Sequence, residues 1–360
     1  MAPGAAGSVH ATLRALQPLL GTAYSAPMNG DPLERIAARA DTPVVAPCAL
    51  LEPPVARPVP IADMPMVAAF LDGVQRSRVL AHVDGTPLVY ATVAAAVRER
   101  RDRQLVTWGA PERRALLLAS RRALGGEIWQ RLGDAGVMPI DLEVPGDEGG
   151  GRREHGEPWG HAEPADPATV PVDVPWHPHA LRARALALVA LEREQLERRL
   201  AARWCAAESR WLWIDGGIAG NLALDASAPA FGVVKSHNTL YGDHEAVRRV
   251  LGLHEGERSP AFLVGHRLRR AVASWYLRLR TAAHGDPLFG LVRVEVVPPP
   301  ALLTAEADAA ARDQFSRQCD TLSSAILLER HPVSLPDARW DTLAYGVHAV
   351  ESYLKAIIGP

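Results

Sequence analysis

Cysteine is scarce in this sequence of 360 residues, which contains only Cys48, Cys205 and Cys319. The three lie far apart and show no paired spacing, so neither a zinc site nor a disulfide framework is expected. Isolated thiols of this kind are typical of cytoplasmic proteins, in which disulfides are rare. We therefore expect a cytoplasmic protein.

Long apolar runs and a strong net charge are also missing. No segment reaches the roughly 18–20 apolar residues that a membrane-spanning helix needs, and the N-terminus does not resemble a secretory signal, so no membrane contact is expected. The formal net charge is −2 at pH 7, so any binding of nucleic acid would depend on local basic patches. The absence of a Walker A motif argues against the motor of an ATP-driven system.

The composition that remains predicts a globular protein with two weakly ordered segments. Hydrophobic residues make up 48% of the chain, enough for a sizeable core in one large or two medium domains. Residues 1–61 are predicted to be an Ala- and Pro-rich N-terminal arm, with a short helix over 32–39 and an extended strap over 43–60. Residues 144–179 lack periodicity, which indicates a mobile insertion within the domain at 62–358.

Two apolar, strand-like runs each end in an aspartate followed by a glycine. Residues 70–73 read Phe-Leu-Asp-Gly, and residues 211–217 read Trp-Leu-Trp-Ile-Asp-Gly-Gly. This pattern predicts Asp72 and Asp215 at strand ends where the backbone turns. Two such ends brought together could bind a divalent metal. The alternative is that Asp-Gly only marks a turn, which is our expectation for Asp84-Gly85.

Hydrophobic periodicity predicts the other elements of the fold. A hairpin is expected around the first Asp-Gly pair, followed by a helix over 93–103, and the clearest helix spans 180–204. Further helices are predicted over 127–132, 245–251, 305–329 and 340–358. Strands are predicted over 67–71, 78–83, 88–90, 114–120, 211–214, 230–234, 260–264, 273–280 and 289–297.

The long helix carries a glutamate, Glu192, in the middle of its apolar stripe. A carboxylate on a buried face is costly unless it is paired, and a metal shared with Asp72 and Asp215 would be such a partner. A buried Glu–Arg ion pair is an equally acceptable interpretation. Glu194 and Glu197 are interpreted as solvated partners of neighbouring arginines.

Lys235 follows the predicted strand over 230–234 and could contact a phosphate oxygen near Asp215, or could be a solvated strand end. The glycine-rich loop over 216–220 faintly resembles a dinucleotide-binding loop. Its spacing does not fit that fingerprint, and Pro229 follows where a helix should run.

The best basic surface is predicted on the two antiparallel strands near residues 273–297, beside Trp275 and Tyr276, which could stack on bases. The alternative is the polar outer face of an antiparallel sheet. On the last helix, a satisfied, half-buried role for His348 competes with a catalytic one. The arginines predicted to bind DNA are Arg269, Arg270, Arg278, Arg280 and Arg293, with Arg267 beside them.

The order of these motifs, rather than any one of them, resembles the NurA nucleases over residues 62–358. The shared order is a strand with Asp-Gly, a hairpin, a long helix with Glu, and a second strand with Asp-Gly. It continues with Gly-Val-Val-Lys-Ser at 232–236, Trp-Tyr-Leu-Arg-Leu at 275–279, Val-Arg-Val-Glu at 292–295 and a C-terminal helix with His. The resemblance implies an α/β fold with an RNase H-like mixed sheet core, flanked by helices and followed by C-terminal helices.

Matched by motif, Asp72, Glu192 and Asp215 correspond to the family's three carboxylates and His348 to its C-terminal histidine. Two departures stand out. Residues 340–341 read Trp-Asp where the family has an aromatic-proline pair, so the tyrosine sometimes found there is missing. The first motif reads Asp-Gly-Val-Gln rather than Asp-Gly-Ser, which keeps the carboxylate and changes its surroundings.

The resemblance implies a DNA nuclease that hydrolyses phosphodiester bonds in end processing, repair or defence. Asp72, Glu192 and Asp215 would bind Mn²⁺ or Mg²⁺, and Lys235 and His348 would assist at the phosphate or the leaving oxygen. The expected partners are DNA, a HerA-like hexameric ATPase and a second copy of the chain. Two other classes stay open: a non-catalytic NurA-like scaffold that binds DNA or the ATPase, and a nucleotide-binding enzyme that uses the loop at 216–220.

Overall fold

The computed structural model describes residues 43–60, 67–102, 104–134, 139–143, 177–265, 270–281, 286–303, 309–330 and 345–358. The helix predicted over 32–39 and residues 144–176 of the predicted insertion lie outside the described residues, as does the predicted boundary between residues 61 and 62. Among the described helices, none is long and apolar enough to cross a membrane.

The described strands form one large mixed sheet, so the prediction of an α/β protein with a mixed sheet flanked by helices is confirmed at that level. Twelve strands take part, in the order β2-β12-β13-β14-β9-β8-β4-β5-β6-β7, with β11 pairing to β13 and β3. The long strands are β4 (Ala69–Val83), β5 (Thr86–Arg101) and β6 (Gln104–Ala119). The shorter ones are β2 (Ala49–Leu50), β3 (Arg57–Pro58), β7 (Ile140–Asp141), β8 (Leu212–Asp215), β9 (Ala230–Val234), β11 (Glu257–Arg258), β12 (Phe262–Val264), β13 (Val272–Arg278) and β14 (Leu291–Val296).

The hairpin of β4 and β5 turns at Asp84-Gly85, as predicted for that pair. Asp84 and Gly85 both have positive φ angles, 47° and 77°, which a tight two-residue hairpin turn requires. The predicted hairpin around the first Asp-Gly pair is therefore wrong. Residues 67–71 and 78–83, expected as two strands, belong mostly to the single strand β4, and Asp72 lies inside it.

The helix predicted over 93–103 is also wrong, because this alanine-rich segment is the second half of β5. Alternate residues of β5 face opposite sides of the sheet. Val93, Ala95 and Val97 belong to the core cluster on one face, whereas Ala94 and Ala96 belong to the cluster on the other. A strand buried on both faces reads as a continuous apolar run without alternation, which periodicity alone cannot separate from a buried helix.

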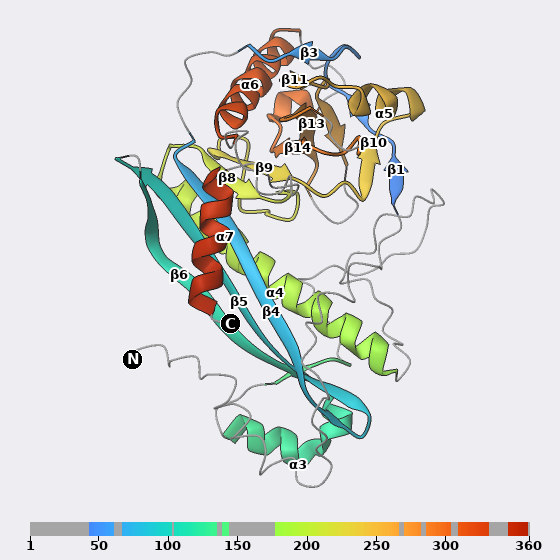
Figure 1. Cartoon of the computed structure of the whole chain (residues 1–360), viewed down its shortest axis with the longest axis vertical. Coiled ribbons are helices and arrows are strands. Elements are labelled where there is room, and N and C mark those ends of the chain that lie inside the picture. The colour runs from blue at the N-terminus through green and yellow to red at the C-terminus, as the bar shows by residue number, and fades with distance from the viewer. Residues whose placement is uncertain are drawn as a thin grey trace.

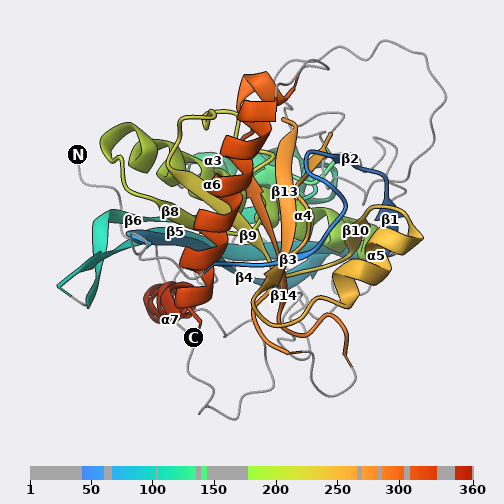
Figure 2. The same ribbon diagram turned by 90° about the horizontal axis from the view of Figure 1, so that it is seen from above.

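Two helices cover opposite faces of the long strands, as Figures 1 and 2 show. The predicted long helix is confirmed as α4 (Pro178–Ala207), and its apolar side packs in the first core cluster. The predicted last helix is confirmed as α7 (Tyr345–Ile358), which packs in the second cluster. The other described helices are α3 (Arg121–Asp134), α5 (His244–Leu251), α6 (Ala309–Leu328) and the short 3-10 helix η3 (Pro300–Leu302).

The segment from residue 43 to residue 60 is extended, as predicted, but it does not form a separate arm. Its strands β2 and β3 join the large sheet by pairing with β12 and β11. Its first strand, β1 (Val44–Ala46), pairs in parallel with β10 (Thr239–Tyr241). Sequence reasoning missed this because short, Pro-flanked strands carry little periodic signal.

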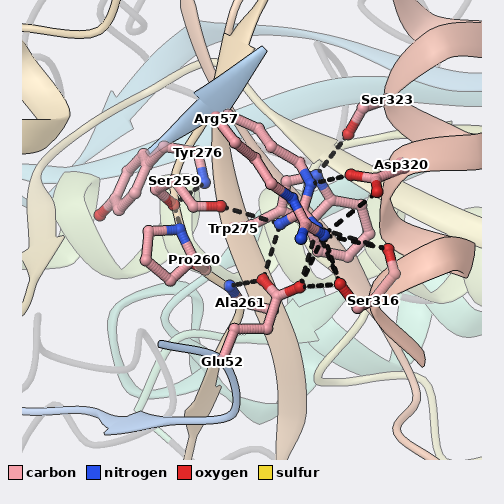
Figure 3. Close-up of polar contacts among 11 residues, drawn as sticks. Glu52, Arg57, Ser259, Pro260, Ala261, Trp275, Tyr276, Ser316, Asp320 and Ser323 are labelled. Atoms are coloured by element: carbon pink, nitrogen blue, oxygen red, sulfur yellow. Dashed lines mark hydrogen bonds and ion pairs between the residues drawn. The ribbon is translucent and has the colours of Figure 1, made fainter. Parts of the chain in front are cut away.

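A buried charged cluster fastens this segment to α6 (Figure 3). The Arg258 side chain is fully buried and donates to the Glu52 carboxylate at 2.7 and 2.8 Å and to Asp320 of α6 at 2.6 Å. Glu52 also accepts from Ser316 and from the backbone N–H of Ala261. Burial acts to raise the pKa of Glu52, but the hydrogen bonds and charge of Arg258 outweigh it and lower the pKa from 4.5 to about 2.

We predict that Glu52→Gln destabilises the protein at neutral pH by about 3 kcal/mol, because it leaves a buried guanidinium short of its counter-charge. Because folding lowers the pKa of Glu52, its charge stabilises the fold fully at pH values above 4.5, the pKa in the unfolded chain. This stabilisation is lost as the pH falls toward 2, the pKa in the folded protein. The difference in unfolding free energy between wild type and variant should therefore shrink between pH 6 and pH 3 in urea titrations. The exposed change Glu245→Gln serves as control, and an unchanged difference at both pH values would contradict the prediction.

Candidate functional site

Asp72 and Asp215 lie side by side on neighbouring parallel strands. The register of β4 and β8 pairs Ala69 with Leu212 and Leu71 with Ile214, so the next two residues along are Asp72 and Asp215. Residues in register on adjacent parallel strands point to the same face, with strands about 4.8 Å apart. The structure thus brings together the two predicted carboxylates.

Only the second Asp-Gly pair ends a strand. Asp215 is the last residue of β8, and Gly216 turns the chain with a φ of 114°, a conformation that glycine adopts most readily. Asp72 is instead the fourth residue of β4 and pairs with Ala96 of β5. The prediction that Asp72 lies at a strand end is therefore wrong, although its partner β8 does end beside it.

Lys235 provides the nearest cation to the two aspartates. Lys235 directly follows β9, which pairs in parallel with β8. Asp215 pairs with Val233, two residues before Lys235. Its Nζ lies 2.8 Å from Asp215 Oδ2, and both side chains are largely buried. Among the described residues, the other carboxylate oxygen, Asp215 Oδ1, is buried without a hydrogen-bond partner. The described residues therefore satisfy only one oxygen of Asp215.

The glutamate that α4 brings to this region is Glu197 rather than Glu192. Glu192 forms an ion pair with Arg114 of β6 at 2.9 Å, so the Glu–Arg alternative holds for the partner, but the pair is partly exposed rather than buried. Glu197 is buried, and its charge acts on Asp72. The interpretation of Glu197 as a solvated residue is therefore wrong.

The Glu197 carboxylate occupies the space that Gly73 leaves free. A Cβ atom added to Gly73 would overlap Glu197 Oε1 and lie 3.0 Å from the side chain of Arg193. Arg193 forms an ion pair with Glu197 and donates to Gln75 at 3.2 Å. Gly73 and Gln75 both belong to the first Asp-Gly-Val-Gln motif, so this motif shapes the position of the helix carboxylate.

Burial raises the pKa of all three carboxyl groups of this site, and their mutual repulsion adds to the effect. The pKa of Asp72 is raised well above its ordinary value by burial and then by the charges of Asp215 and Glu197. Burial raises the pKa of Glu197 to about 7, against the opposing charge of Arg193. The pKa of Asp215 is raised by burial, opposed by Lys235 and assisted by Glu351.

The last helix reaches the same region. Gly346 of α7 packs directly against the ring of Phe70, two residues before Asp72 on β4. The predicted His348 lies two residues further along α7, with its side chain 43% exposed and its Nδ1 3.9 Å from a carboxylate oxygen of Glu351. Sequence reasoning did not single out Glu351, and no motif marked it.

A cavity of about 440 Å³ opens beside Asp215 on the α4 side of the sheet. Its walls include Glu197 and Arg193 of α4, the loop after β8, and Glu295 of β14. The Glu295 carboxylate accepts from the Ile218 N–H at 2.8 Å, which fixes this loop. Within the described residues 216–229 no helix follows the loop, so it lacks the helix N-terminus that a dinucleotide site uses.

The predicted basic surface on β13 and β14 is wrong for Arg278 and Arg293, whose side chains are largely buried, and stays a prediction for Arg270 and Arg280. Arg278 is fully buried and donates to four backbone carbonyls, those of Leu251, Leu253, Pro287 and Phe289. The rings of Trp275 and Tyr276 are also buried and cannot stack on bases. Arg280 pairs with Glu255, Arg293 pairs with Glu295, Arg270 donates to the Leu222 carbonyl, and Arg267 and Arg269 lie outside the described residues.

The arrangement offers hard oxygen donors in a mostly buried, negatively charged setting. Among the described residues, no three His, Cys, Asp or Glu side chains lie close enough together to hold a metal ion. Asp72, Asp215 and Glu197 nevertheless act on one another electrostatically. The sequence matches no family model, and no curated protein matches it.

We predict that Gly73→Ala destabilises the protein by about 1–3 kcal/mol, because its Cβ overlaps the Glu197 carboxylate. In a strand interior the same change ordinarily stabilises, since glycine costs about 0.5–1 kcal/mol relative to alanine. In a Glu197→Ala background, Gly73→Ala should therefore become neutral or stabilising, as urea unfolding of the four proteins would measure. Gly126→Ala in α3, where a Cβ meets nothing within 4 Å, is the control. Equal effects of Gly73→Ala in both backgrounds would contradict the placement of Glu197.

Proposed function

We propose that this protein is a metal-dependent DNA nuclease with an RNase H-like core of the NurA type. The observation that carries the proposal is the juxtaposition of Asp72 and Asp215 on adjacent parallel strands, with Glu197 approaching from the covering helix. Metal-dependent hydrolysis of a phosphodiester needs such a group of carboxylates.

The connections between the elements that carry these residues support an RNase H-like core. The strand β4, which carries Asp72, pairs antiparallel with β5, and β5 pairs antiparallel with β6. The chain then crosses the sheet through α4. It returns as β8 and β9, parallel to β4 on its other side. The resulting order β6-β5-β4-β8-β9, with β5 alone antiparallel to the rest, is the order of an RNase H-like sheet.

The residues present fit a divalent cation. Among the described residues, Asp215 Oδ1 is buried without a partner, and the pKa of the neighbouring Asp72 is raised by burial and then by the charges of Asp215 and Glu197. Two aspartates on adjacent strands repel each other, so a cation bound between them would lower the pKa of both. Carboxylate oxygens are the donors that Mn²⁺ and Mg²⁺ take in proteins.

When bound, Mn²⁺ or Mg²⁺ would activate a water nucleophile and offset the charge that develops on the scissile phosphate. Asp72 and Asp215, whose side chains share one face of the sheet, would hold the cation, and Glu197, fixed by Arg193 on the opposite face against Gly73, would act on them through its charge. Lys235 lies within reach of Asp215 and can turn its ammonium group toward a phosphate oxygen. His348 is exposed enough to exchange a proton at the leaving oxygen.

DNA as the substrate, a HerA-like hexameric ATPase as partner, and a homodimer follow from the resemblance to NurA nucleases and form part of this proposal. The same holds for a role in end processing, repair or defence. Because the side chains of Arg278 and Arg293 are buried and paired within the fold, residues other than these two would bind the phosphate backbone.

We predict that Asp72→Asn and Asp215→Asn each lower Mn²⁺-dependent degradation of labelled linear DNA by roughly a hundredfold or more, and that Glu197→Gln, which removes a charge acting on them from α4, lowers it less. Glu192→Gln, a matched change on the same helix, should retain activity, because Glu192 pairs with Arg114 away from the aspartates. Circular dichroism and thermal unfolding of each variant verify folding.

Single- and double-stranded substrates should be tested with and without the ATPase. Cleavage at the wild-type rate by a folded Asp215→Asn protein would overturn the proposal. DNA binding without cleavage under all conditions would favour the scaffold subunit instead.

A further inference from the structure

The helix α7 runs alongside β4 in the same direction (Figure 1). Gly346 marks the contact, because it packs against the ring of Phe70. From Gly346 to Glu351, five residues of helix advance about 7.5 Å. From Phe70 to Asp72, two residues of strand advance about 6.6 Å. Glu351 therefore lies at the same level as Asp72, whose side chain points to the α7 face, as that of Phe70 does.

One flank of α7 faces β5, and Glu351 lies on the other. The Tyr353 ring packs under the guanidinium of Arg98 in β5, at 4.5 Å. The buried stripe of α7 runs through Val347, Val350 and Leu354. Glu351 lies on the side of this stripe opposite Tyr353, which directs it toward β8, the strand that ends in Asp215.

A further observation concerns the aspartate itself. Among the residues that the structure describes, the buried oxygen Asp215 Oδ1 has no hydrogen-bond partner, so it can accept a ligand bond. Glu351 itself is bound on one oxygen by Lys355 at 2.6 Å, and Lys355 is 64% exposed, so this pair contributes little and is easily exchanged.

We propose that Glu351 is a further carboxylate of this site, which binds a hard divalent cation together with Asp215. The inference rests on the proposed function, because it places an additional ligand at the same centre. Among the described residues, the cations that pair with carboxylates of this region are Lys235 with Asp215, Arg193 with Glu197 and the exposed Lys355 with Glu351.

The test measures Mn²⁺ binding directly, by calorimetric titration and by the rise in melting temperature that Mn²⁺ causes. Glu351→Gln should weaken Mn²⁺ binding by roughly tenfold or more and reduce the rise in melting temperature, without lowering the melting temperature of the metal-free protein. Glu351→Asp, which keeps the carboxylate, should bind Mn²⁺ with intermediate affinity. Glu245→Gln, an exposed carboxylate on α5, is the control and should bind as wild type.

The outcomes separate this inference from the proposed nuclease activity. If wild type binds Mn²⁺, Asp215→Asn does not, and Glu351→Gln binds normally, the role of Glu351 is overturned and the carboxylate centre stands. If Glu351→Gln weakens binding but no DNA is cleaved under any condition, the role of Glu351 stands and the nuclease proposal fails. If wild type itself does not bind Mn²⁺, both are overturned.

Discussion

The in-register pairing of β4 with β8 is the constraint on which the rest of the structure depends. It places Asp72 beside Asp215, in a region where burial disfavours both negative charges. Two buried like charges are unfavourable unless a cation or a proton compensates them. Lys235 supplies part of this compensation, while burial and the neighbouring carboxylates still raise the pKa of Asp72.

Such a site needs a rigid frame, and the alanine-rich strand β5 provides it. Its small side chains face both α4 and α7, so both helices approach the same strands closely from opposite sides. α4 thereby brings Glu197 to one side of the carboxylate pair, and α7 brings Glu351 toward the other. The buried Arg258 cluster, together with β2 and β3, holds the far part of the sheet to α6.

The sequence predicted the parts of the fold whose signal is local. The long helix α4, the strands β8, β9, β13 and β14, and the turn at Asp84-Gly85 all follow from periodicity or turn chemistry. Asp72 and Asp215 stand out in the sequence because each follows an apolar run and precedes a glycine. The second half of β5 reads as a helix, because a strand buried on both faces has no alternation. The buried Arg278 was taken for a surface residue, because only the folded loops around it reveal the carbonyls that it binds.

The choice between Glu192 and Glu197 shows why a helical pattern alone could not identify the site. In the first half of α4 the buried residues include Leu181, Ala185 and Val189, whereas Glu197, Ala201 and Trp204 are buried near its end. The buried stripe thus moves around the helix as it crosses a twisted sheet. Glu192 lies on the side that becomes exposed, and Glu197 on the side that becomes covered. Only the strand beneath decides which glutamate is buried, and there Gly73, by having no side chain, makes room for the Glu197 carboxylate.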